Sequence, residues 1–252
     1  MNILLTNDDG YSAEGLKILK DVLQKKHKIF IFAPESQKSG ASHSISLFSD
    51  IKVKKFGKNQ FYVCGTPADC ILIAENYLKD KYKIDLVISG INHGQNVGDD
   101  IYYSGTFGAA REAMFSGKKA IAVSIFTNSS TYDYHFAASK ISDFLDVGLT
   151  NYISKDELLN INFPAVESKK IKGIIITHLG KRKYTNFVSR DVKFSKDMFF
   201  YIGAEDMKFV LDPESDVNAT TDGYISITPI SKASTSTSTS IELNKWLKKC
   251  LK

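Results

Sequence analysis

Apolar and polar positions alternate in the first part of the chain in a pattern typical of βα units. Residues 3–5 form a short apolar run, and the turn-forming residues 7–10 follow it directly. Leu16, Leu19 and Leu23 then recur at helical spacing, and residues 28–34 (KIFIFAP) form a compact apolar run that is typical of a buried strand. Residues 2–34 therefore predict a strand, a loop, a helix and a second strand.

The same alternation continues to about residue 148. Residues 45–63 contain short alternating segments that predict a hairpin or meander, and Pro67 marks the start of a helix. The elements expected after it are a strand at 85–90, a helix of small residues at 105–117, a strand at 119–126 and a helix at 134–148. Strands that alternate with helices predict an α/β fold with a doubly wound, mostly parallel sheet.

The remaining residues follow a different pattern. Residues 171–180 (IKGIIITHLG) are strand-like, and residues 221–230 (TDGYISITPI) predict a closing strand. Residues 181–224 are polar and aromatic without clean periodicity, which favours extended β-hairpins. The Ser/Thr-rich residues 232–240 predict a flexible connector, and residues 241–252 predict a short amphipathic helix.

Composition and charge exclude several classes of protein. The 252 residues are 43% hydrophobic and 24% charged, which excludes a wholly disordered chain. The net charge of +5 comes almost entirely from lysine, whereas recognition of phosphate and guanine favours arginine. A nucleic-acid-binding protein is therefore a disfavoured alternative. The only arginines are Arg111, Arg182 and Arg190.

The location of the protein is expected to be cytoplasmic. No apolar run approaches the ~20 residues that a membrane span requires, and the first ten residues lack the basic region of a secretory signal. The three cysteines, Cys64, Cys70 and Cys250, are odd in number and lack close metal-ligand spacing. They predict neither a disulfide framework nor a zinc site.

Polar clusters follow the predicted strands at the carboxyl ends, where doubly wound sheets bind their ligands. Asp8 and Asp9 come directly after the first strand. Two adjacent carboxylates repel each other unless a cation lies between them, and Mg²⁺ prefers oxygen ligands of this kind. A simple turn is the alternative interpretation of this segment.

Two further loops carry residues that suit a phosphate site. Residues 36–44 offer hydroxyl groups and His43, a candidate acid or base, although a solvent-exposed loop would have the same composition. Asn92 and Asn96 lie in the loop after the strand at 85–90. Residues 104–106 open a helix whose free N–H groups suit an anion. A helix cap by Ser104 or Thr106 is compatible with that interpretation.

Several well-known motifs are absent. The chain contains neither the G-x-G-x-x-G dinucleotide fingerprint after its first strand nor a P-loop, and it lacks the G-x-S-x-G nucleophile elbow. The first loop also lacks the D-x-D spacing of phosphatases that form an aspartyl-phosphate. These observations exclude the commonest nucleotide-binding and hydrolase signatures.

Five segments together closely resemble the SurE family, the stationary-phase survival proteins that act as metal-dependent 5'/3'-nucleotidases. The resemblance extends from residue 1 to about residue 230, with the segments in family order. They are ILLTNDDGYSAEG, APESQKSGASHSIS, CGTPADC, SGINHGQNVGDDIYYSGTFGAAREA and DGYISITP.

The resemblance implies a Rossmann-like catalytic domain at 1–178 and a smaller β-hairpin-rich oligomerisation part at 179–230 that returns to the sheet. A Ser/Thr linker and a helix would follow at 231–252. It also implies hydrolysis of nucleoside 5'-monophosphates to nucleoside and phosphate, with 3'-monophosphates and short polyphosphate as further substrates in some members. The implied assembly is a homodimer or homotetramer, with neither a membrane nor a specific nucleic acid as partner.

The resemblance also assigns roles to single residues. One divalent cation, Mg²⁺ or Mn²⁺, is expected as cofactor, with Asp8, Asp9 and Asn96 as catalytic residues. The implied metal ligands are Asp8, Asp9, Ser39 and Asn92, and the implied phosphate-binding residues are Asn96, Ser104, Gly105 and Thr106. Gln95 and Phe107 differ from the residues that are common at these positions in the family. We expect these two differences to affect how the substrate fits, but not the chemistry.

The mechanism expected from these residues is metal-assisted hydrolysis of a phosphomonoester. The general acid or base is either a carboxylate, such as that of Asp9, or His43, and the sequence does not distinguish between them. Ser39 is disfavoured as a covalent nucleophile because no base is evident beside it. The alternatives of other classes are a non-catalytic nucleotide or phosphate sensor on the same fold and a purely structural assembly module.

Overall fold

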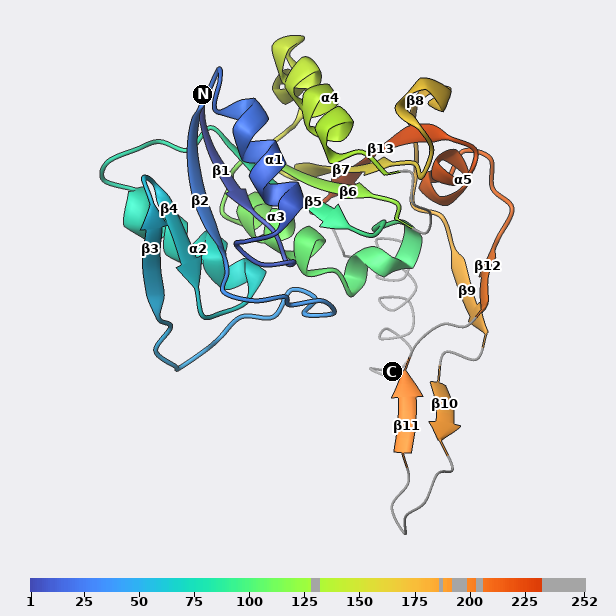
Figure 1. Ribbon diagram of the computed structural model, residues 1–252, viewed down its shortest axis with the longest axis horizontal. Helices are drawn as coiled ribbons and strands as arrows, with labels where there is room; N and C mark the ends of the chain where they lie inside the picture. Colours follow the sequence, from blue (N-terminus) through green and yellow to red (C-terminus); the bar gives the residue numbers. More distant parts are fainter. Residues whose placement is uncertain (128–131, 186–187, 192–198, 203–205, 233–252) are drawn as a thin grey trace, which may run out of the picture.

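The computed structural model describes residues 1–127, 132–185, 188–191, 199–202 and 206–232. The predicted helix at 241–252 and nearly all of the predicted Ser/Thr connector lie outside these residues. A nine-stranded sheet forms the body, in the order β3-β4-β2-β1-β5-β6-β7-β13-β8 (Figure 1). Its strands are β1 (Asn2–Thr6), β2 (Lys28–Pro34), β3 (Val53–Gly57), β4 (Gln60–Val63), β5 (Leu86–His93), β6 (Ala120–Ile125), β7 (Glu157–Phe163), β8 (Gly173–Ile176) and β13 (Tyr224–Ser231).

The sheet is mostly parallel. β1 pairs in parallel with β2 on one side and with β5 on the other, so that Leu4 lies opposite both Phe30 and Val87. β6 and β7 extend the sheet beyond β5 in the same direction, and β4 pairs in parallel with β2. Antiparallel pairing occurs only between β3 and β4 and between β13 and β7 within this sheet. The predicted α/β fold with a mostly parallel sheet is thus confirmed.

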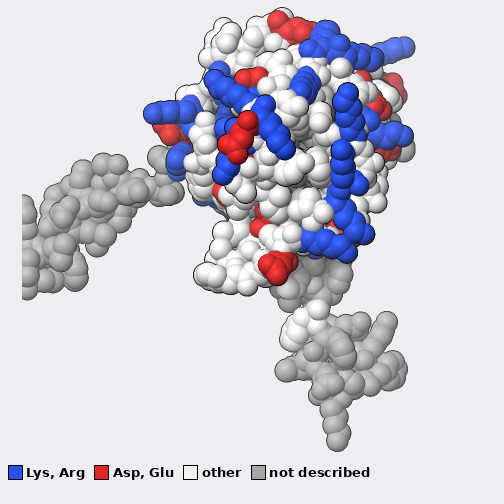
Figure 2. Space-filling view, turned by 90° about the vertical axis from the view of Figure 1, so that its left-hand side faces the viewer, with Lys and Arg blue, Asp and Glu red and all other residues white. Residues whose placement is uncertain are grey.

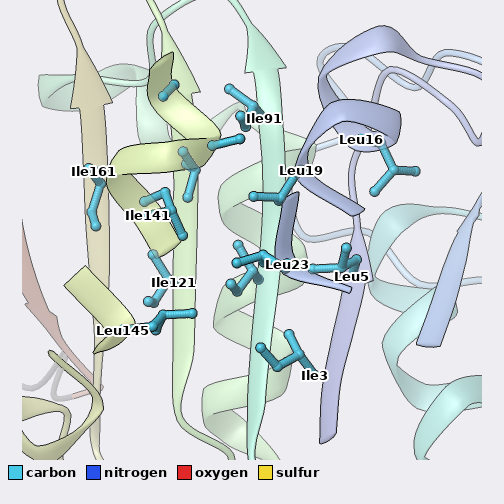
Figure 3. Packing of buried hydrophobic residues seen from close by; sticks show 14 of the residues in the cluster. Ile3, Leu5, Leu16, Leu19, Leu23, Ile91, Ile121, Ile141, Leu145 and Ile161 are labelled. Atoms are coloured by element: carbon cyan, nitrogen blue, oxygen red, sulfur yellow. The ribbon is translucent and has the colours of Figure 1, made fainter. Parts of the chain in front are cut away.

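Helices cover both faces of the sheet (Figure 1). The main helices are α1 (Glu14–Leu23), α2 (Pro67–Leu78), α3 (Gly105–Phe115) and α4 (Tyr134–Asp146). Figure 3 shows Leu19 and Leu23 of α1 and Ile141 of α4 against strand residues such as Ile3 and Ile121. Each such fully buried side chain contributes about 1.5–3 kcal/mol of transfer free energy.

The opposite face is covered by α2 and α3, which pack on residues such as Phe30 and Phe32. The small residues of α3 allow neighbouring backbone to come close. A Cβ added at Gly108 would lie 2.3 Å from the carbonyl oxygen of Ser42, so the loop at 36–44 crosses directly over this helix. The contact places that loop beside the first turn of α3.

Side-chain caps fix the starts of three of the four main helices. Thr66 and Asp69 form a capping box at α2, with Asp69 N–H donating to Thr66 Oγ1 and Thr66 N–H donating to Asp69 Oδ2. Ser104 Oγ accepts from the N–H of Phe107 at α3, and Asp133 Oδ1 accepts from the N–H of Phe136 at α4. The start of α2 at Pro67 agrees with the sequence prediction.

Some elements differ from the sequence prediction. β7 was not predicted, because Asn160 and Asn162 interrupt its apolar run although both are completely buried. β5 continues to His93, beyond the predicted end of that strand. A 3-10 helix, η1 (Gly98–Tyr102), and a short helix, α5 (Asp216–Thr221), form within segments that were predicted as a loop and as hairpins.

The segment at 182–209 forms antiparallel pairs, as the lack of periodicity predicted. β9 (Arg182–Thr185) pairs with β12 (Asp206–Phe209), and β10 (Val188–Asp191) pairs with β11 (Phe199–Ile202). These hairpins extend away from the body (Figure 1). The boundaries of the three predicted parts of the chain stay predictions. In the described part of the chain, no helix has the length and hydrophobicity to cross a membrane.

Candidate active site

The carboxyl ends of β1 and β5 bring the predicted site residues together. Asn7 turns the chain after β1 by donating from Nδ2 to the carbonyl oxygen of Gly10, whose φ of +101° suits glycine. The N–H of Lys38 donates to the carbonyl oxygen of Asp8 at 2.7 Å. The loop at 36–44 is thereby tied to the turn that carries the two carboxylates.

Asp8 is buried against the first turn of α3. Its Oδ1 accepts a 2.5 Å hydrogen bond from Thr106 Oγ1. A Cβ added at Gly105 would lie 2.9 Å from the Cβ of Asp8, so only glycine permits this approach. Burial raises the pKa of Asp8, the hydrogen bond from Thr106 opposes the shift, and the charge of Asp9 adds to it.

Asp9 is more accessible than Asp8 and faces the end of β5. Its Oδ2 accepts from the N–H of His93 at 3.0 Å, and partial burial raises its pKa. Two neighbouring carboxylates that both resist ionisation make the turn electrostatically unfavourable when both are charged. A bound cation would relieve this cost.

Ser39 and Asn92 line the same cavity as Asp8. Asn92 donates from Nδ2 to the carbonyl oxygen of Gly94, which leaves its Oδ1 to accept or to coordinate. Ser39 Oγ accepts from Gln37 Nε2 at 2.9 Å. Together with the two carboxylates, these residues form an oxygen-only donor set that fits a hard divalent cation such as Mg²⁺ or Mn²⁺.

The candidate metal centre depends on neutral ligands as well as acidic ones. Among the described residues, no group of three or more His, Cys, Asp or Glu side chains is placed to hold a metal ion. Half of the predicted ligand set is a hydroxyl and an amide.

Asn96 is held by a buried network that connects it to β6 and β7. Its N–H donates to Asn162 Oδ1 at 2.8 Å, and its carbonyl oxygen accepts from the Nδ2 atoms of Asn160 and Asn162. Its own Nδ2 donates to Ser124 Oγ at 2.8 Å. The sequence analysis did not single out these supporting residues. The available signal was two asparagines at alternate positions of an apolar segment.

Neighbouring residues at the start of α3 have different roles. Ser104 lines the cavity while its Oγ caps the helix. The Thr106 hydroxyl is completely buried and holds Asp8, so that hydroxyl does not face the cavity. The first N–H groups of a helix lack backbone acceptors within the helix, and here the N–H of Phe107 is satisfied by Ser104 Oγ. The predicted metal and phosphate roles of all these residues stay predictions.

The cavity has a volume of about 710 Å³. Its wall contains five of the predicted site residues, namely Asp8, Ser39, Asn92, Asn96 and Ser104. Asp9, Gly105 and Thr106 lie beside Asp8 but outside the wall. The wall also contains Gln95, which the sequence analysis connected with the fit of the substrate. Further residues of the wall had been given no role in the site: Gly40, His93, Asp99, Asp100, Tyr102 and Tyr103. Most of these flank Asn92, Asn96 and Ser104 in sequence.

The charge of the cavity wall differs from that of the face seen in Figure 2. On the face seen in Figure 2, lysine and arginine side chains are spread over the body with carboxylates between them. The wall of the cavity, within the described residues, contains the carboxylates Asp8, Asp99 and Asp100 and neither lysine nor arginine. A phosphate group in this cavity would need positive charge from a bound cation.

Of the two histidines near the site, the sequence analysis proposed His43 as an acid or base, but it is His93 that lines the cavity. His43 Nε2 pairs with Glu112 Oε2 at 2.6 Å, its ring faces Phe115, and it lies outside the wall of the cavity. His93 lies in the wall, and its Nδ1 shares a 2.8 Å hydrogen bond with the hydroxyl of Tyr134. Burial raises the pKa of Tyr134, so this hydroxyl stays protonated beside the ring of His93.

Comparisons with known proteins agree with this arrangement. The family model described as "Survival protein SurE" matches residues 3–186. A protein named "5'-nucleotidase SurE" from Campylobacter jejuni is 44% identical and covers 98% of this chain and 97% of its own length. One of the same name from Syntrophomonas wolfei is 41% identical over 234 residues, which are 91% of this chain and 88% of that protein. The crystal structure of the SurE protein from Aquifex aeolicus superposes with a TM-score of 0.87 at 33% identity, covering 98% of this chain and all of that one.

Proposed function

The chain belongs to the SurE family, and on this basis we propose that it is a 5'-nucleotidase that uses one divalent cation to remove phosphate from nucleoside 5'-monophosphates. The names of the relatives support the nucleotidase activity. The reaction breaks the bond between phosphorus and the ribose oxygen. Water supplies the hydroxyl group that joins phosphorus, and its proton ends on the nucleoside.

The observation that carries the metal dependence is the chemistry of the cavity wall. Asp8, Ser39 and Asn92 carry side-chain oxygen atoms and line one cavity, and Asp9 is the neighbour of Asp8 in the chain. The described part of this wall contains no lysine or arginine to neutralise a phosphate dianion. We propose Asp8, Asp9, Ser39 and Asn92 as the residues that hold Mg²⁺ or Mn²⁺.

When bound, the cation supplies positive charge to the phosphate and lowers the pKa of a water molecule. The chain's own residues orient the substrate. One hydrogen of Asn96 Nδ2 is donated to Ser124, and the second can be donated to a phosphate oxygen. The N–H of Gly105 at the start of α3 provides a further donor, and Ser104 lies in the wall beside it.

We propose the carboxylate of Asp9 as the group that takes up the proton of the attacking water. His43, the other candidate from the sequence, is bonded to Glu112 and does not line the cavity, whereas Asp9 is adjacent to Asp8 in the chain. Asp9 Oδ2 accepts from the N–H of His93, which fixes the orientation of the carboxylate. Asp8, in contrast, is almost completely buried and is held by Thr106.

The finer substrate range and the location are part of the same proposal. An open cavity of about 710 Å³ is large enough for a nucleotide in either orientation, so 3'-monophosphates and short polyphosphate are further candidate substrates. We place the protein in the cytoplasm, on the sequence features given above.

We also propose that the hairpins at 182–209 assemble the chain into a homodimer or homotetramer. Large apolar side chains on and beside these hairpins are exposed, with 58% of Phe200, 67% of Ile202 and 85% of Leu211 open to solvent. Exposed apolar residues on an extended element are typical of an interface between subunits.

The experiment is phosphate release from a panel of nucleoside 5'- and 3'-monophosphates with Mg²⁺, with Mn²⁺ and with EDTA. Asp8→Asn is compared with Asp143→Asn, a matched change at a surface position whose side chain is 59% exposed. We expect metal-dependent release that Asp8→Asn abolishes and Asp143→Asn retains. A folded protein that binds nucleotide without releasing phosphate would instead support the sensor function.

A further inference from the structure

Two tyrosines form part of the cavity wall without being buried. Tyr102 and Tyr103, at the end of η1, are 54% and 66% exposed and both line the cavity. Aromatic rings that remain open in a concave polar site offer apolar surface to a ligand. No step of the hydrolysis requires a tyrosine at this position.

The backbone that carries these rings is fixed from the neighbouring loop. Ser42 Oγ donates to the carbonyl oxygen of Tyr102 at 2.6 Å, and Ser42 N–H donates to that of Tyr103 at 3.0 Å. The N–H of Tyr103 donates to the carbonyl oxygen of Asp100 at 3.0 Å. The rings are thus presented on an anchored backbone, which lowers the entropy lost when a ligand binds.

The charges in the wall determine which part of a nucleotide can lie here. Asp99 and Asp100 precede the tyrosines and repel a phosphate group. The candidate cation ligands and the start of α3 provide the opposite environment beside Asp8. The anionic end of a nucleotide therefore belongs near Asp8, and its uncharged base belongs near the tyrosines.

We propose that Tyr102 and Tyr103 form a nucleobase-binding subsite, in which an aromatic ring stacks on the base of the substrate. This inference rests on the proposed function, because it concerns the same cavity. Stacking tolerates every base, since each base has a π face. The subsite favours purines over pyrimidines through their larger stacking surface, without selecting one purine.

The test compares a substrate that has a base with one that lacks it. The double variant Tyr102→Leu/Tyr103→Leu keeps apolar side chains but removes both rings. Tyr152→Leu is the matched control, because Tyr152 is 81% exposed and lies outside the cavity. The quantity measured is the ratio of kcat/KM for adenosine 5'-monophosphate to kcat/KM for glycerol 2-phosphate.

We expect the double variant to lower this ratio by about tenfold, mainly through KM for the nucleotide, which is within the range of stacking on one base. The control should keep the wild-type ratio. An unchanged ratio in the double variant, or an equal loss with both substrates, would overturn the subsite.

A binding measurement keeps the inference separate from the proposed function. Absence of phosphate release by the wild type would contradict the nucleotidase function alone. Calorimetric titration with adenosine, which carries no phosphate, then tests the subsite directly. Weaker binding by the double variant than by the wild type and the control supports the subsite, whereas equal binding, or no binding by any of the three, overturns it.

Discussion

The hydroxyl of Thr106 donates a hydrogen bond to Oδ1 of Asp8, and so joins residues that are 98 positions apart. It connects the first turn of α3 to the loop after β1. The bond orients a buried carboxylate before any cation is bound, and the positive end of the α3 dipole lies at the same place.

Replacement of Thr106 by valine tests this connection. Thr106→Val preserves the shape of the side chain but removes the donor, so Asp8 loses its orientation. Because partners of metal ligands typically contribute 10- to 100-fold to affinity or activity, we expect about a tenfold increase in the Mn²⁺ concentration that gives half-maximal phosphate release. Thr106→Ser keeps the hydroxyl and should stay near wild type. An equal effect of both changes would contradict the role of the hydrogen bond.

The raised pKa of Asp8 predicts a pH dependence of stability in the absence of metal. Burial holds this pKa above its value in the unfolded chain, so the folded protein binds the proton more tightly. The resulting stabilisation is complete below the unfolded pKa and is lost as the pH rises through the folded pKa. In EDTA, the Tm should therefore fall as the pH rises through this window.

Two further samples make this measurement specific. Asp8→Asn, which cannot ionise, should show a smaller fall of Tm over the same pH series. Addition of Mg²⁺ to the wild type at neutral pH should restore its Tm, because the cation binds the folded state. A pH dependence that is identical in Asp8→Asn and wild type would assign the effect to other groups.

The network around Asn96 predicts that residues of β7 affect catalysis without reaching the substrate. Asn162→Ala removes both the acceptor for Asn96 N–H and a donor to its carbonyl oxygen. A buried group left without its partner costs about 1–3 kcal/mol, so the Tm should fall by several degrees. We expect kcat to fall together with it, because Asn96 loses its position.

The control for this prediction is Asn76→Ala, at an exposed position of α2. It should change neither kcat nor Tm measurably. Asn162→Ala with a lower Tm but wild-type kcat for adenosine 5'-monophosphate would show that the network supports only the fold.

The position of His43 predicts that this residue is dispensable for turnover. His43→Gln removes the hydrogen bond between the imidazole and Glu112, and His43 is not one of the residues that line the cavity. We expect kcat/KM to change by no more than about twofold, the equivalent of ~0.5 kcal/mol. Asp9→Asn, assayed in parallel, should lose most of the activity. A large loss in His43→Gln across the whole pH range would return the proton-transfer role to this histidine.

The sequence was sufficient to predict those helices and strands whose apolar spacing or capping residues lie within the element itself. Apolar spacing located the helix with Leu16, Leu19 and Leu23, and Pro67 located the start of α2. The motifs also identified the family, because their order along the chain is specific. β7 was not predicted because two of its buried positions are asparagines. Asparagine is normally exposed, and here its burial depends on contact with Asn96.

The sequence predicted which loops form the site, but not the directions of the side chains within those loops. Positions at the carboxyl ends of β1 and β5 indicated Asp8, Asp9 and Asn92, since parallel strands end at one edge of the sheet. Local sequence does not determine where a loop side chain points, so His43 was a candidate although it faces Glu112. Likewise, only the three-dimensional arrangement places His93 and the tyrosines in the wall.

The place of β13 in the sheet has a consequence for the synthesis of the protein. This strand inserts between β7 and β8, with Thr228 opposite Asn160 and Ser226 opposite Asn162. Until residues 224–231 have left the ribosome, β7 remains an open sheet edge, and the asparagines that hold Asn96 lack their neighbours. A nascent chain that ends before this strand therefore exposes the edge of β7 and leaves Asn160 and Asn162 without the strand that lies beside them in the finished sheet. We expect the support of Asn96 to reach its final order only once β13 has paired with β7.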